Sequence, residues 1–152
     1  MAITSAVCTS FKVELLKGVH NFTATTGNTF KIALYTSDAT LGASTTAYAT
    51  TNEITNTSGS AYTAGGAALT IASSSPTSSG TTAWVDFDNV SWSSASFTAN
   101  GCMIYNTTTG SGSGTTDSVI IVAFGGDKTV SSGTFTVQFP TPDASDAILR
   151  IA

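Results

Sequence analysis

The fold of this chain is decided by residues 118–139, which read SVIIVAFGGDKTVSSGTFTVQF. The first part, Ser118–Phe124, is almost entirely apolar, which is typical of a central strand covered on both faces. Gly125–Lys128 then predicts a turn. After it, Thr134–Phe139 alternates between apolar and polar residues, as a strand with one buried face does, and Pro140 ends it because proline supplies no ladder N–H. The segment therefore predicts two antiparallel strands.

Further strands are predicted along the whole chain. Thr29–Thr36 alternates well and places Phe30, Ile32 and Leu34 toward a core. Three other segments have strand-forming composition, namely Thr46–Ile54, which is the weakest, Ala68–Ile71, and Ala147–Ala152 at the end of the sequence.

Two segments carry irregularities in their pattern. In Ala83–Trp92 the apolar positions change parity after Phe87, which predicts a β-bulge or kink near Asp88–Asn89. Phe97–Tyr105 contains Asn100–Gly101, the strongest short-range signal for a hairpin. Because the flanking apolar segments are short, a bend within one strand is the alternative.

These segments amount to about eight or nine short strands, which is the pattern of an all-β protein. We expect one domain spanning residues 1–152, an antiparallel β-sandwich or jelly-roll-like barrel, preceded by an arm or short helix over about residues 1–22. The predicted core consists of Phe30, Ile32, Leu34, Val85, Phe87, Ile120, Val122, Phe124, Phe135, Val137 and Phe139.

The N-terminal segment Ser10–Gly18 predicts a short helix, which Ser10 can cap and Gly18 can close. A strand with Phe11, Val13 and Leu15 on one side is the alternative. The stretch from Phe11 to Phe22 has more apolar side chains than a short helix needs to pack on one sheet. Its surplus face is the candidate contact with a neighbouring subunit or with the shell of a larger assembly, and the candidate interface residues are Phe11, Val13, Leu16, Val19 and Phe22.

The charge content is low, because only 9% of the residues are charged and the formal net charge is −4. The five permanent cations are Lys12, Lys17, Lys31, Lys128 and Arg150. This scarcity argues against nucleic acid and against an anionic membrane surface as partners. The start of the sequence lacks the pattern of a signal peptide, so we expect a product of the cytoplasm in which Cys8 and Cys102 stay unpaired.

Few residues suggest catalysis, and we expect no enzyme, no cofactor and no metal. His20 is the single histidine, no nucleophile-elbow pattern surrounds any serine, and His20 is predicted to be a polar surface or capping residue. Asp86 and Asp88 would share one face of a strand and could act as paired carboxylates or as Ca²⁺ ligands. A solvated strand face is the preferred interpretation of that pair.

Aromatic residues could form a platform on which sugars stack. The candidates are Trp84, Trp92, Tyr35, Tyr48, Tyr62 and Tyr105. In small β domains such residues more often belong to the core or to a subunit interface, so we favour that assignment.

Four segments carry a resemblance to a known group of proteins: FKVELLKGVHNF at Phe11–Phe22, FKIALYT at Phe30–Thr36, YTAGG at Tyr62–Gly66, and AILRIA at Ala147–Ala152. In these, the chain resembles small proteins encoded among the structural genes of tailed bacteriophages. Their shared motifs concern packing and turns, so no functional residue is carried over.

The resemblance implies a virion structural protein, most like a head decoration or cement protein. Such a protein would be made in the host cytoplasm, form a homotrimer, and bind the major capsid protein on the capsid surface through many weak contacts. The alternative is a receptor- or glycan-binding module of a phage tail or fibre, which predicts exposed aromatic residues clustered on one loop face.

Overall fold

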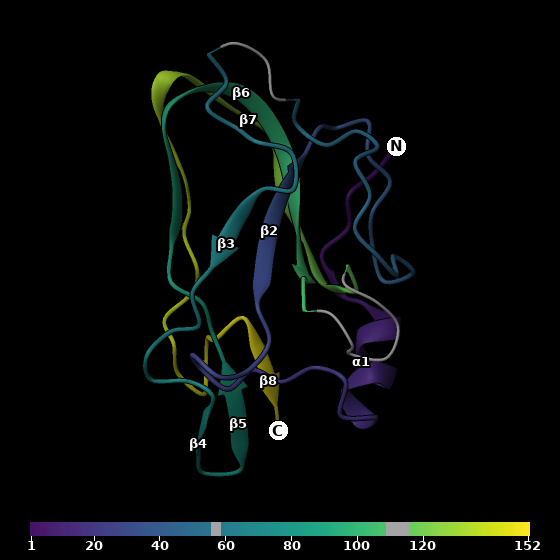
Figure 1. Cartoon of the computed structure of the whole chain (residues 1–152), viewed down its shortest axis with the longest axis vertical. Coiled ribbons are helices and arrows are strands. Elements are labelled where there is room, and N and C mark those ends of the chain that lie inside the picture. The colour runs from purple at the N-terminus through teal and green to yellow at the C-terminus, as the bar shows by residue number, and fades with distance from the viewer. Residues whose placement is uncertain (56–58, 109–115) are drawn as a thin grey trace.

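The computed structural model describes residues 1–55, 59–108 and 116–152. Within these residues it contains one short helix and eight strands, arranged in two antiparallel sheets (Figure 1). The larger sheet has the order β1 (Ala6–Val7), β7 (Ser118–Val137), β6 (Val90–Asn106), β2 (Phe30–Tyr35) and β3 (Ala67–Leu69). The smaller has the order β4 (Thr77–Ser79), β5 (Thr82–Val85) and β8 (Leu149–Ile151). The predicted all-β class with two antiparallel sheets is confirmed.

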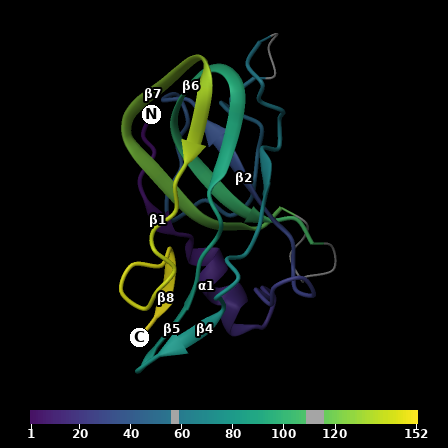
Figure 2. The same ribbon diagram turned by 90° about the vertical axis from the view of Figure 1, so that its left-hand side faces the viewer.

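The two longest strands, β6 and β7, pair with each other as a bent ribbon that arches over one end of the molecule (Figure 1). The smaller sheet lies at the opposite end, as the view turned by 90° also shows (Figure 2). The register between β6 and β7 shifts along β6 between Trp92 and Ala95, between Ala95 and Phe97, and between Ala99 and Gly101. Bulges of this kind bend and twist a strand pair, so they account for the arch.

Both turn signals in this part of the sequence lie inside the long strands. The predicted hairpin at Asn100–Gly101 and the predicted turn at Gly125–Lys128 are therefore wrong, and the alternative of a bend within a strand holds for Asn100–Gly101. The two signals face each other across the ribbon, where Ala99 pairs with Lys128. Gly125 and Gly126 have φ angles of +73° and +135°, so their freedom of conformation bends the strand instead of reversing the chain.

Large side chains fill the inside of the arch. The ring centroids of Phe97 and Phe135 are 5.0 Å apart, and those of Trp92 and Phe135 are 6.2 Å apart. Seven of the residues predicted for the core are buried, while Val122, Phe124, Phe135 and Val137 are partly buried and pack against it. These four line a hollow beside the arch.

The parity change after Phe87 marks a change of sheet. Val85 pairs with Leu149 in the smaller sheet, whereas Val90 pairs with Val137 in the larger one. The bulge or kink expected near Asp88–Asn89 within one strand is therefore wrong, because the chain there leaves one sheet and enters the other.

The strand predicted at Thr46–Ile54 is wrong. That segment makes only isolated bridges, in which Ala47 pairs with Asp117 and Glu53 with Tyr35. A strand needs successive pairs with one neighbour, and here the backbone contacts two different elements.

Helix α1 (Thr9–Leu16) confirms the helical prediction and excludes the strand alternative. Cys8 occupies the N-cap position with no side-chain hydrogen bond, so the predicted cap by Ser10 is wrong. The Cys8 N–H instead donates to the carbonyl oxygen of Val119 in β7, at 3.0 Å. Cys8 and Cys102 are both buried and free. Among the helices described, none is long and apolar enough to cross a membrane.

Candidate functional site

The predicted interface segment is divided between the core and the surface. Phe11 and Phe22 are buried, with exposed fractions of 1% and 9%, so they cannot supply contacts to another molecule in the folded chain. Val19 is half-buried. Val13 and Leu16 are exposed, at 47% and 90%. The candidate surface is therefore narrower than the sequence pattern suggested.

Helix α1 is held firmly on its inner side. Phe11 packs against His20 and Phe22, with ring centroids 4.8 and 6.0 Å away. The Thr9 N–H donates to the carbonyl oxygen of Ala43 at 2.8 Å, which ties the first turn of the helix to a neighbouring loop. Gly18, with a φ angle of +72°, lets the chain leave the helix and return toward the core. The exposed residues of α1 consequently sit on a fixed support.

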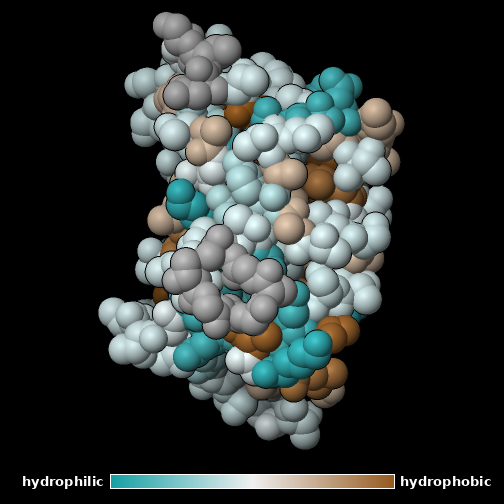
Figure 3. Space-filling view, turned by 45° about the vertical axis from the view of Figure 1, so that its right-hand side comes forward, coloured by the Kyte–Doolittle hydropathy of each residue, from teal (hydrophilic) through white to brown (hydrophobic). Residues whose placement is uncertain are grey.

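Four residues on the solvent side of α1 form the surface that we call the α1 outer face: Lys12, Val13, Leu16 and Lys17, all exposed. They lie on one side of the helix because, at about 3.6 residues per turn, positions i, i+1, i+4 and i+5 fall on neighbouring directions. Figure 3 shows apolar surface next to hydrophilic surface at the lower end of the molecule, where α1 lies in Figure 1. The face thus combines two apolar side chains with two ammonium groups.

His20 is part of a buried hydrogen-bond chain, and the prediction that it lies on the surface or caps the helix is wrong. The Asn106 amide donates to His20 Nδ1 at 3.0 Å and to Asn28 Oδ1 at 2.9 Å. Since His20 Nδ1 accepts, its Nε2 carries the proton and donates to Glu14 Oε2 at 2.8 Å. Both ring nitrogens are occupied by structural partners, and the His20 side chain is 0% exposed. The imidazole links the segment after α1 to β6.

Asp86 and Asp88 do not form a pair. Asp86 is buried, at 1% exposed, and its carboxylate accepts from the N–H groups of Phe87 at 2.8 Å and Ile148 at 3.3 Å. Burial raises the pKa of the Asp86 carboxyl, and those two donors oppose the rise. Asp88 is exposed. The structure therefore excludes the solvated strand face for Asp86, whose carboxylate fastens the chain just after β5 to the chain just before β8.

No group of three or more His, Cys, Asp or Glu side chains within the described ranges is placed to hold a metal ion. A polar cluster surrounds the carboxylate of Glu53, which is 5% exposed and which the sequence pattern did not reveal. It accepts from the hydroxyls of Tyr48 and Tyr62, each at 2.6 Å, and from the Gly65 N–H at 2.7 Å. No pattern in one strand could have shown this, because its donors come from separate loops.

All four tyrosines of the chain gather around Glu53. Burial, helped by the nearby Glu53 carboxylate, raises the pKa of each tyrosine, and that of Tyr105 rises to about 12. Tyr62 also accepts from the Leu34 N–H at 3.0 Å, and the Tyr105 hydroxyl donates to the Gly65 carbonyl at 2.7 Å. Each phenol thus stays protonated and donates, so the cluster pins the loops onto β2 and β6.

The six aromatic residues considered as a sugar platform are not displayed on the surface. Five are buried and Tyr48 is half-buried, stacked on Tyr105 with ring centroids 4.5 Å apart. The prediction that these aromatic residues belong to the core is confirmed for the five that are buried.

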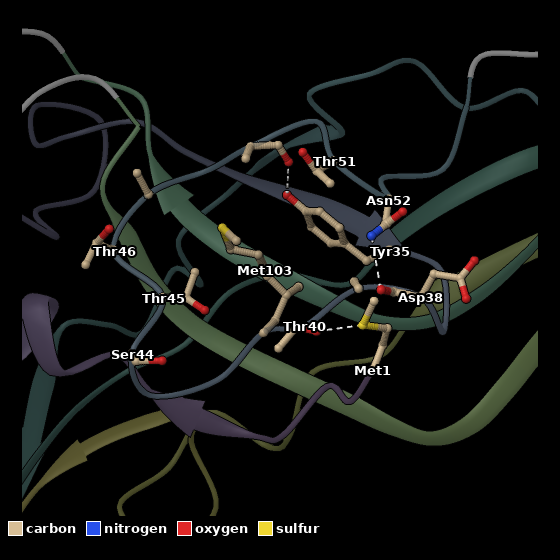
Figure 4. Close-up of a pocket in the computed structure, with 14 residues that line it drawn as sticks. Met1, Tyr35, Asp38, Thr40, Ser44, Thr45, Thr46, Thr51, Asn52 and Met103 are labelled. Carbon is tan, nitrogen blue, oxygen red and sulfur yellow. Dashed lines mark hydrogen bonds between the residues drawn. The ribbon is translucent and has the colours of Figure 1, made fainter.

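A hollow of about 490 Å³ opens beside this cluster, and we call it the 38–52 hollow after the loop that forms most of its wall (Figure 4). Its floor contains Tyr35, whose hydroxyl donates to the Ala49 carbonyl at 2.8 Å, and the buried Met103. Hydroxyls of Thr and Ser residues surround the opening. Asp38 supplies the one side chain of Asp, Glu, Lys or Arg among the described residues that line it.

Comparison of the chain with protein-family models, with curated proteins and with solved structures found no match in any of the three. The function is therefore inferred from the residues of the chain, together with the resemblance in its sequence.

Proposed function

We propose that this protein is a non-enzymatic structural component of a multi-subunit assembly, namely a decoration or cement protein on the head of a tailed bacteriophage. One observation carries the proposal: Leu16 is 90% exposed on a helix whose other side is fixed in the core by Phe11. Val13, which is 47% exposed, extends the same apolar surface. The sequence resemblance supplies the kind of assembly, with the major capsid protein as partner.

The energetic argument concerns repeated weak contacts. Burying one leucine side chain contributes about 1.5–3 kcal/mol, which is too little to hold a single copy. Copies that also bind one another, as in the proposed homotrimer, convert the second and third contacts into intramolecular events and so bind far more tightly. A small rigid patch on each copy is sufficient for a protein of this kind.

The roles of the polar residues support a function without catalysis. The groups that acid–base chemistry would use, namely His20, Glu53 and Asp86, are each buried and hydrogen-bonded to the fold. The aromatic residues that a glycan-binding module would display are engaged in the core or in the tyrosine cluster. The glycan-binding alternative therefore has no specific observation in its favour.

The test is binding to purified capsids that lack the protein, followed by co-sedimentation. We expect the wild-type protein to sediment with them, and Leu16→Asp to weaken binding at least tenfold, because a carboxylate would replace the exposed apolar group. Ile151→Asp is the matched control, since Ile151 is also apolar and 59% exposed but lies in β8. Failure of the wild-type protein to bind would overturn the proposal, as would equal loss in both variants.

A further inference from the structure

The α1 outer face is unusual in its charge. It carries Lys12 and Lys17, two of the five cations in a chain that has nine acidic residues. Three of the nine, Glu53, Asp86 and Asp117, are buried, so the rest of the surface carries six acidic residues and three cations and is acidic on balance. A basic and apolar face on an acidic protein is complementary to another copy of the same protein, provided that the copy offers a hollow with an apolar floor and a carboxylate beside it.

The 38–52 hollow has these properties. Asp38 is exposed at its wall, and its position is fixed because its backbone carbonyl accepts from the Asn52 side-chain amide at 3.0 Å. The floor is apolar where Met103 and Ala39 lie, both buried. Glu53, which is buried, pairs through its backbone with Tyr35 of the floor. Its carboxylate adds negative potential near the hollow.

We propose that the α1 outer face of one copy docks into the 38–52 hollow of a second copy, with Leu16 in the hollow and Lys17 beside Asp38. This inference rests on the proposed function and assigns the α1 outer face to the contact between copies. Leu16→Asp would then weaken capsid binding indirectly, because single copies lose the multivalency of the trimer. The hollow of about 490 Å³ is large enough to admit a leucine side chain. Burial of Leu16 supplies the apolar contact, and the ion pair at the edge selects the orientation.

The two surfaces share no residue, so one copy can present its helix and receive a neighbour's helix at the same time. A contact between two different surfaces is heterologous, and such contacts close into a ring when the rotation between copies allows it. The proposed homotrimer is a ring of this type. The contact thus gives the trimer a physical basis that does not depend on the capsid.

The first experiment is a charge exchange, measured as self-association by sedimentation equilibrium at low salt. Lys17→Glu and Asp38→Lys should each weaken association about three- to fivefold, as for an exposed ion pair. The double variant should recover most of the loss because the pair is restored with reversed signs. Lys128→Glu and Asp88→Lys make the same changes of charge at exposed positions outside both surfaces and should have no effect.

A second experiment traps the contact covalently. Both native cysteines are buried, so a cysteine introduced at the surface reacts selectively. Val13→Cys protein is mixed with Ser44→Cys protein of different tag length and oxidised, and disulfide-linked heterodimers are measured on a non-reducing gel. Their yield should exceed that of Val13→Cys mixed with Ser78→Cys, an exposed position in β4, at least fivefold.

The outcomes separate this inference from the proposed function. Recovery in the double variant and selective trapping support the docking. A wild-type protein that is monomeric at all concentrations overturns it, as do charge variants that lower association no more than their controls. If Leu16→Asp still abolishes capsid binding in that case, the α1 outer face contacts the capsid and the proposed function stands.

Discussion

The rings of Phe124 and Phe135 lie 6.1 Å apart although both residues belong to the same strand, β7. Residues this far apart in one straight strand could not touch, because a strand rises about 3.3 Å per residue. The contact therefore exists only because the β6–β7 ribbon arches and brings the two limbs of β7 together.

This contact should contribute to stability. Phe135→Ala should lower the free energy of unfolding by about 2 kcal/mol, less than for a fully buried phenylalanine because Phe135 is partly exposed. Phe124→Ala combined with it should cost less than the sum of the single changes, by roughly 0.5–1.5 kcal/mol. Urea denaturation measures both values. Thr136→Ala, on the other face, should change stability by no more than about 0.5 kcal/mol, and strict additivity of the phenylalanine variants would contradict the arch.

Gly101 should be irreplaceable because of space. A Cβ at this position would lie 2.7 Å from the carbonyl oxygen of Val122 and 2.8 Å from Cγ2 of Ile3. Gly101→Ala must push the β6 and β7 backbones apart, so we expect a loss of about 2 kcal/mol or more, measured by thermal unfolding. At Gly42 the nearest atoms would be 3.8 Å away, so Gly42→Ala should be tolerated. Equal effects of the two changes would show that the strands are not this close.

His20 should matter for stability and leave assembly unchanged. His20→Ala removes a buried ring packed against Phe11 and takes an acceptor from the buried Asn106 amide, so we expect a loss of about 2–3 kcal/mol in chemical denaturation. Thr26→Ala, at an exposed position nearby, should have little effect. Below its melting temperature the His20 variant should bind capsids as the wild type does. A catalytic activity that disappears with His20 would contradict the proposed function.

Alkaline pH should unfold the protein cooperatively. Burial raises the pKa of Tyr105 from 10.0 to about 12 and the pKa of the Cys102 thiol from 9.0 to about 12. In both cases the folded chain favours the protonated form. Their contribution to stability is therefore fully present below the ordinary pKa values and is lost as the pH rises from about 9 toward 12. Unfolding by urea at pH 8, 10 and 11 tests this.

Variants separate the two groups in the alkaline range. Cys102→Ala should flatten the pH dependence of stability that begins near pH 9. Tyr105→Phe should remove part of the dependence above pH 10, where the other three tyrosines also contribute. Each variant is compared with its own stability at pH 8. Unchanged stability of the wild type up to pH 11 would mean that these groups are not buried as described.

Local pattern determined much of this protein. The alternation in Thr29–Thr36 predicted β2, and the apolar run of Ser118–Phe124 predicted the first part of β7. The apolar residues of Ser10–Gly18 and the final glycine predicted a helix that α1 confirms, although the helix begins after Cys8 and Ser10 does not cap it. These features depend on the direction in which neighbouring side chains point, which the residue order alone decides. The low charge and the scarcity of catalytic residue types are also properties of composition.

Tertiary structure decided between local conformations, and between buried and exposed positions, that the sequence pattern allowed equally. Asn100–Gly101 could reverse the chain or bend it. The bend was selected because β6 pairs with β7 on both sides of this dipeptide. Leu16 and Phe11 are both apolar residues of α1, and only the packing of Phe11 on His20 and Phe22 determines which of them remains exposed. The carboxylate of Glu53 accepts hydrogen bonds from Tyr48 and Tyr62, which lie in different loops of the chain. Such contacts depend on loop closure and on the shape of the whole core, and no short window of sequence contains that information.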